Sequence, residues 1–201
     1  MRNATINRNT GETQIRMGLE LDGRGTADLG GGTGIGFFDH MLNAFARHGL
    51  FDLDLEARGD LEVDGHHLVE DTGIVLGDAI RQAVGDKAGI RRYGYFVLPM
   101  DEALVLCAVD LCGRPYFVMD FENGKDGFSA PMVGEFDTQL VNEFFYSVSY
   151  AAAMNLHFKI LSGANDHHII EAMFKAFAKA LDMAAQKDPR IEDVLSTKGC
   201  L

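Results

Sequence analysis

Alternating apolar and polar positions predict short β-strands in both halves of the chain. In the first of them, Ile15, Met17 and Leu19 share one face, and the run ends at Asp22-Gly23. The strands predicted in this way cover about residues 15–21, 53–57, 61–63, 103–111, 116–121 and 156–160. The strands at 103–111 and 116–121 are predicted to form a hairpin around Gly113-Arg114-Pro115. Helical patterns predict helices over about 38–48, 66–85, 137–153 and 165–187.

The order of these elements, β-α-β-β-α, occurs twice, and a repeat in the sequence accompanies it. The motif HHxxE begins at His66 and again at His167, 101 residues later. At an offset of 90 residues, Glu12, Gly23 and Arg24 recur as Glu102, Gly113 and Arg114. We therefore expect an α+β fold of duplicated β-α-β-β-α half-domains, about 1–90 and 91–201. Their two sheets and helices would pack in one pseudo-symmetric domain spanning 1–201.

Composition and charge narrow the class of function. The 201 residues are 47% apolar and carry a formal net charge of −12, an ordinary globular composition with an acidic balance. Because an acidic surface repels phosphate backbones and anionic lipids, we expect no nucleic-acid partner and no membrane binding. No apolar run approaches the length of a membrane span. Cys107, Cys112 and Cys200 fit neither a disulfide framework nor a zinc ribbon, so a reducing cytoplasm is the expected location.

Each HHxxE motif places imidazole and carboxylate side chains on one face of a predicted helix. Positions four residues apart stack on one face, so the first histidine points with the glutamate and the second diverges by about a quarter turn. Such a pair suits manganese, iron, zinc or nickel but leaves the ion under-coordinated, so each site needs ligands from another element. The residues concerned are His66, His67, Glu70, His167, His168 and Glu171.

The chain also resembles the imidazoleglycerol-phosphate dehydratases of histidine biosynthesis over nearly its whole length. The resemblance is carried by FDHML at 38–42, HGLFD at 48–52, HHLVED at 66–71, DTQLV at 137–141, SGANDHHIIEA at 162–172, FKA at 174–176 and STKG at 196–199. Two features depart from the family pattern. The segment 30–36 is longer than usual and is expected to be a flexible surface loop, and Leu195 replaces a common proline. Neither departure removes an expected site residue.

The resemblance implies two manganese ions in each active site. The first would be bound by His40, His67, His167 and Glu171, and the second by His66, Glu70, Glu143 and His168. Each ion would then take one pair from one half of the chain and a diverging histidine from the other. Some relatives have histidine at the position of Glu143. The family also implies a homo-oligomer, an octahedral 24-mer with sites shared between subunits, so metal binding and assembly are expected to be coupled.

The implied reaction is the metal-dependent dehydration of D-erythro-imidazole glycerol phosphate to imidazole acetol phosphate and water, through an imidazolate intermediate. The proton that is lost has no neighbouring carbonyl to acidify it, so a metal on the ring is expected to drive out the hydroxyl. Proton transfer would fall to Glu12 or Glu171, and His67 is the third candidate catalytic residue. The implied substrate-binding residues are Glu12, His40, His48, Arg92, Arg114, Ser196 and Lys198, of which the last four would hold the phosphate.

Two other functions are compatible with the same side chains. A di-metal hydrolase would attack a phosphoester with a bridging hydroxide, although such sites are usually richer in aspartate. A non-catalytic metal-storage or assembly protein would turn over no imidazole substrate. For single residues, Glu12 could be only a solvated charge at a strand edge, and the sequence assigns no role to His157.

Overall fold

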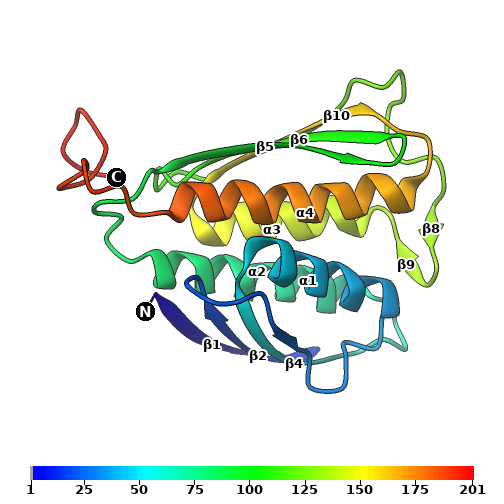
Figure 1. Cartoon of the computed structure of the whole chain (residues 1–201). Coiled ribbons are helices and arrows are strands. Elements are labelled where there is room, and N and C mark those ends of the chain that lie inside the picture. Colours follow the sequence, from blue (N-terminus) through cyan, green and yellow to red (C-terminus); the bar gives the residue numbers. More distant parts are fainter. Residues whose placement is uncertain (1) are drawn as a thin grey trace.

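Two β-sheets enclose a double layer of helices (Figure 1) in a computed structural model that describes residues 2–201. The first half contributes β1 (Asn3–Asn9), β2 (Thr13–Glu20), β3 (Ala27–Asp28), α1 (Gly36–Gly49), β4 (Asp52–Gly59) and α2 (His66–Val84). The second contributes β5 (Tyr93–Met100), β6 (Ala103–Asp110), β7 (Tyr116–Phe121), β8 (Met132–Val133), β9 (Phe136–Asp137), α3 (Leu140–Ala152), β10 (Asn155–Ser162) and α4 (Asp166–Ala185). Apart from the short β8–β9 hairpin, the second half repeats the element order of the first.

The two large sheets have the same strand order. The first is arranged β1-β2-β4-β3 and the second β5-β6-β10-β7. In each, the strand before the last helix pairs antiparallel with the second strand and parallel with the third. Across the helix layers, α2 packs on α3 and α1 packs on α4. The α+β fold with duplicated halves that the sequence predicts is therefore confirmed.

Two details of the predicted elements were wrong. The order is β-β-β-α-β-α, not β-α-β-β-α, because β1 and β5 give no clear alternation and β3 has only two residues. The outward positions of β1 are polar and its burial is slight, whereas β5 carries apolar side chains on both faces. The predicted strand at 61–63 is a turn, in which the Val63 N–H donates to the Asp60 carbonyl. Leu61 and Val63 are exposed, so their alternation reflects no buried face.

The predicted hairpin between β6 and β7 was also wrong, since β10 lies between them. Phe158 of β10 is fully buried and stands opposite Cys107 of β6 and Met119 of β7. The link through Gly113-Arg114-Pro115 therefore crosses the end of β10, where the Asn155 side chain donates to the Arg114 carbonyl. Turn residues mark a change of direction, but they do not determine which strand comes to lie alongside.

Aromatic side chains on α3 and α4 fill the space beneath the second sheet. The ring of Phe145 lies 4.8 Å from Phe174 and 5.6 Å from Phe177, and 4.7 Å from Phe158 of β10. All four are buried, and the spacing of Phe174 and Phe177 puts both on one face of α4. The apolar residues of these helices thus form the core. Within residues 2–201, no helix combines the length and hydropathy needed to cross a bilayer.

The glycine-rich loop before α1 is attached to the first turn of that helix. Gly30, Gly31 and Gly32 have positive φ, a conformation that residues with a Cβ avoid. The backbone N–H and the hydroxyl of Thr33 both donate to Asp39 Oδ1, at 2.8 and 2.7 Å. This contact fixes the start of α1, directly before His40.

Gly94 marks a close contact between β5 and α4. A Cβ at this position would meet the Ala180 carbonyl oxygen and would lie 2.7 Å from the Ala184 nitrogen. Both are helix backbone atoms, which cannot move aside without separating α4 from the sheet. We expect Gly94→Ala to lower the free energy of unfolding by about 3 kcal/mol or more, measured by chemical denaturation.

The equivalent position in the first half, 90 residues earlier, is occupied by Ala4, which is buried. Ala4→Gly is therefore the matched control, and it should cost only about 1 kcal/mol. A Gly94→Ala protein as stable as the wild type would contradict this packing of β5 on α4.

Candidate metal centre

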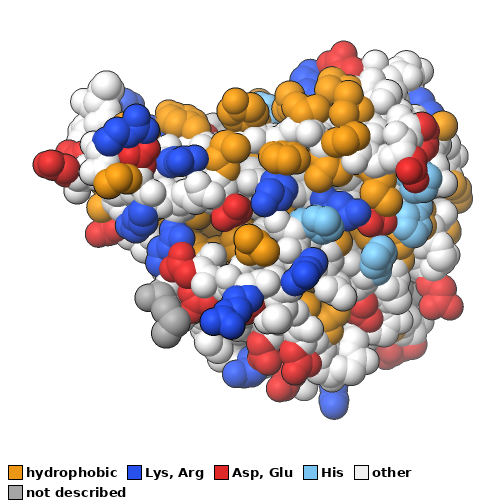
Figure 2. All heavy atoms as spheres, viewed as in Figure 1, with side chains coloured by type: hydrophobic (Ala, Val, Ile, Leu, Met, Phe, Trp, Pro, Cys, Tyr) orange, Lys and Arg blue, Asp and Glu red, His pale blue; other side chains and the backbone are white. Residues whose placement is uncertain are grey.

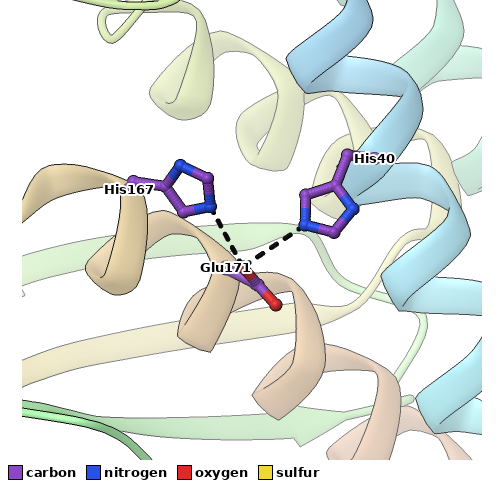
Figure 3. Close-up of side chains that lie close together, drawn as sticks. All are labelled: His40, His167 and Glu171. Carbon is purple, nitrogen blue, oxygen red and sulfur yellow. Dashed lines mark hydrogen bonds and ion pairs between the residues drawn. The ribbon is translucent and has the colours of Figure 1, made fainter.

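Three potential metal ligands from two helices converge at one end of the helix layer (Figure 3). His40 comes from α1, and His167 and Glu171 lie one turn apart near the start of α4. The Nε2 atoms of His40 and His167 are 3.4 and 3.2 Å from the same glutamate oxygen, Oε2. One ligand atom from each residue lies within 4.8 Å of the other two. A single cation could therefore contact all three side chains.

Glu171 is the buried member of this cluster, and its other oxygen is already bound. Lys175 Nζ lies 2.6 Å from Oε1, so Oε2 is the atom directed at the two histidines. Burial by itself would raise the pKa of Glu171, but the hydrogen bond and charge of Lys175 outweigh burial and lower the pKa. The carboxylate is therefore charged at neutral pH, as a metal ligand must be.

The second histidine of each HHxxE motif is held by a carboxylate through Nδ1. The Nδ1–H of His67 donates to Asp60 at 3.0 Å, and that of His168 donates to Glu102 at 2.7 Å. These hydrogen bonds raise the pKa of both histidines, and the bond from His168 lowers the pKa of Glu102 to about 2. An imidazole whose Nδ1–H is fixed in this way presents Nε2 outward, as metal-binding histidines commonly do.

His66 and Glu70 form a more open pair on α2. Their Nε2 and Oε2 atoms are 3.6 Å apart, and both side chains are about two-fifths exposed. Glu143, in the first turn of α3, completes no three-residue cluster with them within residues 2–201. Glu143 and His66 do line one cavity of about 550 Å³, together with Asp64 and Asp137. Carboxylates therefore line the cavity beside His66, but within residues 2–201 they form no three-residue cluster with it.

One chain thus brings together three of the four ligands expected for the first ion. His67, the fourth, lies on α2 beside Asp60 and is not part of the cluster. His168, expected at the second ion, is likewise absent from any cluster with His66 and Glu70 among residues 2–201. Within one chain, His67 and His168 therefore lie apart from the other ligands of the ions to which the resemblance assigns them.

Arg92, expected to bind phosphate, lies at the opposite end of α4. Its backbone N–H donates to the Ala184 carbonyl, in the last turn of that helix. Its guanidinium donates to Asp110 at 2.7 Å and to the Leu195 carbonyl at 2.8 Å. Arg92 therefore attaches the C-terminal tail, which carries Ser196 and Lys198, to the end of the second sheet.

The tail returns toward Arg114, the other arginine expected at the phosphate. The backbone carbon of Leu201 lies 3.0 Å from the place where a Cβ on Gly113 would be. Because 13 residues of α4 separate Glu171 from Ala184, about 20 Å of helix lies between the histidine cluster and the place where Arg92 holds the tail. On the face shown in Figure 2, histidine side chains gather on the side away from the tail.

Two further candidate residues lie near the histidines of the site: Glu12 lies near Asp60, which holds His67, and His48 lies near Lys175 and Glu171. Glu12 lies in the exposed turn between β1 and β2, and within residues 2–201 its carboxylate has no hydrogen-bond or ion-pair partner. It lines a shallow pocket with Asp60, which holds His67. For His48, at the end of α1, partial burial and then the charge of Lys175 lower the pKa, so its ring is neutral at pH 7.

Sequence reasoning assigned no role to Asp60, Glu102 or Lys175. Lys175 follows Glu171 by four residues, a helical spacing that could have indicated the ion pair. Glu102 is recognisable as the repeat of Glu12, but 66 residues separate it from His168 and no local pattern links them. Asp60 was interpreted only as a turn residue, seven positions before His67.

Residues 33–181 match the family model described as imidazoleglycerol-phosphate dehydratase. The chain belongs to the imidazoleglycerol-phosphate dehydratase family. It is 60% identical to the imidazoleglycerol-phosphate dehydratase of Lachnoclostridium phytofermentans over 198 residues, covering 98% of this chain and 97% of the relative. It is 58% identical to that of Acetivibrio thermocellus over 196 residues, with 98% and 97% covered. As a member of this family, the chain is a hydro-lyase of histidine biosynthesis.

Solved structures of imidazoleglycerol-phosphate dehydratases have the same fold. The Staphylococcus aureus enzyme is similar with a TM-score of 0.80 and 38% identity, covering 92% of this chain and 99% of that one. The Pyrococcus furiosus enzyme, solved in complex with (S)-C348, gives a TM-score of 0.77 at 36% identity, with 98% and 100% covered. The duplicated two-sheet architecture is therefore that of the family.

Proposed function

We propose that this dehydratase acts through two manganese ions in each active site, bound by residues from more than one copy of the chain. The convergence of His40, His167 and Glu171 carries the proposal. The first ion would take these three ligands and His67 of another copy. The second would be bound by His66, Glu70, Glu143 and His168, again with contributions from separate copies.

The donor atoms of the cluster fit such an ion. Imidazole nitrogen with carboxylate oxygen and no thiolate suits manganese and its neighbours among the divalent metals. The buried carboxylate of Glu171 is charged and is oriented by Lys175. His67 and His168 have their rings fixed through Nδ1, which leaves Nε2 to bind an ion presented by another copy.

When bound, the ions would make the imidazole ring of the substrate more acidic, so that the hydroxyl on the adjoining carbon can leave. The side chains of the protein would handle the protons. Glu12 would accept the proton from the next carbon, since its carboxylate is not engaged by another residue among 2–201. The proton released from the ring would go to the departing hydroxyl, which would leave as water, and the proton accepted by Glu12 would return to the ring as the resulting enol becomes the ketone. Glu171, held by Lys175 and two histidines, would remain a ligand.

The distance along α4 supports shared sites. The substrate spans only a few bonds of about 1.5 Å between its ring and its phosphate. It therefore cannot reach both the histidine cluster and the tail of one chain, which about 20 Å of helix separates. Arg92, Arg114, Ser196 and Lys198 would bind the phosphate at a site whose metal ligands come from neighbouring copies. A homo-oligomer is then required, and an octahedral 24-mer is the assembly we propose.

The chain would work as one domain spanning 1–201, with halves of about 1–90 and 91–201. Its expected location is the cytoplasm, where the unpaired thiols of Cys107, Cys112 and Cys200 stay reduced.

Mixing two inactive variants tests the shared sites. Glu171→Gln damages the cluster, and Arg114→Ala damages the phosphate site at the far end of α4. If each active site draws these residues from different copies, dissociating and reassembling an equal mixture should restore about a quarter of wild-type turnover. The measurement is dehydration of imidazole glycerol phosphate, with oligomer size followed by light scattering.

Each variant reassembled alone is the control and should stay inactive. Wild-type protein taken through the same steps sets the maximum recovery. A reassembled mixture with no more activity than its two components would contradict the sharing of sites between copies.

A further inference from the structure

The two halves of the chain use equivalent glutamates differently. Glu102 accepts hydrogen bonds from His168 Nδ1 and from the backbone N–H groups of Ala164 and Asn165. Its repeat, Glu12, makes no side-chain contact of this kind within residues 2–201. In the first half, Asp60 holds the second histidine of the motif instead. The first-half glutamate is thereby left available for chemistry.

The turn that carries Glu12 is attached to α2 by a chain of hydrogen bonds, of which the one between Thr13 and Asp71 is buried. The Thr13 hydroxyl donates to Asp71 Oδ2, and Arg8 Nε donates to the other oxygen of Asp71 at 2.8 Å. Since the Thr13 proton is used in this way, the Thr10 hydroxyl, 3.1 Å away, donates to Thr13. Thr10 Oγ1 in turn accepts from the backbone N–H groups of Glu12 and Thr13, at 3.1 and 2.9 Å.

The second half replaces this network with apolar residues. The 90-residue offset places Leu98 at the position of Arg8 and Ala103 at that of Thr13, and the 101-residue offset of the motif places Ala172 at that of Asp71. All three are buried in the hydrophobic core. The second half has the same strand order and an equivalent helix with these three apolar residues. The fold itself therefore does not need the hydrogen bonds of Arg8, Thr13 and Asp71.

We propose that Thr13 and Asp71 are positioning residues that hold the Glu12 carboxylate in place for proton transfer. The proposal rests on the role of Glu12 in the proposed function. A buried hydrogen bond from Thr13 to a carboxylate that also pairs with Arg8 contributes little net stability compared with apolar residues of similar size. It does fix the turn that carries Glu12 relative to α2, whose N-terminal part also carries His67 and Glu70. Small displacements of a catalytic group are costly, so this geometry has a kinetic effect.

Thr13→Val tests the inference, because it removes the hydroxyl and keeps the shape. We expect kcat to fall about tenfold to a hundredfold, with KM and manganese content close to wild type. Thr13→Ser, which keeps the hydroxyl, should restore most of kcat. Ser149→Ala is a matched control, since it removes a buried hydroxyl that donates to Met154 on the opposite half. Its turnover should be unchanged.

Combining Thr13→Val with Glu12→Gln decides whether Thr13 acts through Glu12. If it does, Thr13→Val causes no further loss in the Glu12→Gln protein. An equal loss in both backgrounds, or a wild-type kcat for Thr13→Val, would overturn the inference. Near-normal turnover of Glu12→Gln alone would instead refute the proposed role of Glu12. Should Thr13→Val fail to assemble, the Thr13→Ala/Asp71→Ala protein serves for the same comparison, because it copies the second half at these two positions and leaves no buried carboxylate.

Discussion

Removal of divalent metal is expected to lower the dehydration of imidazole glycerol phosphate by at least about a thousandfold, and manganese is expected to restore it. The proton to be removed has no adjacent carbonyl, so the protein's carboxylates alone provide a poor path. His40, His167 and Glu171 direct one donor atom each at the same location, where a divalent cation could bind all three (Figure 3). Turnover and metal content would be measured on the same samples after chelation and after manganese is added back.

The size of the oligomer would be measured on the same metal-free and manganese-restored samples. If the ligands of one ion come from different copies, removal of metal should also weaken the assembly. Full turnover in protein shown to contain no metal would refute the proposed mechanism. Release of phosphate from simple esters would favour a di-metal hydrolase. Unchanged metal stoichiometry without turnover of any imidazole substrate would favour a storage protein.

Glu12→Gln is expected to lower kcat by about a thousandfold while metal content and assembly stay as in the wild type. The amide has nearly the same shape as the carboxylate but cannot accept the proton. Since Glu12 lies in an exposed turn and its carboxylate has no hydrogen-bond or ion-pair partner within residues 2–201, the fold should not respond. Turnover would be compared with metal content and with size in solution.

The equivalent substitution in the second half provides the contrast. Glu102 holds His168, so Glu102→Gln should weaken manganese binding by about tenfold to a hundredfold, and added metal should recover part of the lost turnover. Added metal should not rescue Glu12→Gln. Near-normal turnover of Glu12→Gln with intact metal and assembly would remove Glu12 from the mechanism.

Much of the architecture could be predicted because the relevant patterns are local. The helices follow from apolar periodicity, and the observed α2 and α4 begin at or within one residue of the duplicated HHxxE motif. The pairing of β10 between β6 and β7 could not be predicted, since it depends on which apolar faces meet after folding. The absence of alternation in β5 has a similar cause, because apolar side chains occupy both its faces.

The candidate site, too, could be predicted only where the relevant residues are close in sequence. The pair His167–Glu171 is visible as a four-residue spacing, but its meeting with His40 needs α1 to pack on α4. Asp60 and Glu102, the carboxylates that orient the diverging histidines, could not be predicted from a sequence pattern. Each precedes its histidine by several residues or more and belongs to a different element. Spacing along a helix thus indicated candidate metal ligands, whereas tertiary packing determined which of them lie close together.

The different environments of Glu12 and Glu102 have a consequence for how such an enzyme can arise. A half-length peptide pairing with itself could build two matching layers, but symmetry would force both copies of any acid into one environment. Joining the two copies by a peptide bond removes that restriction, because each position can then mutate alone. Linkage of the halves in one polypeptide therefore permits one glutamate to serve as scaffold while its twin is kept for reaction.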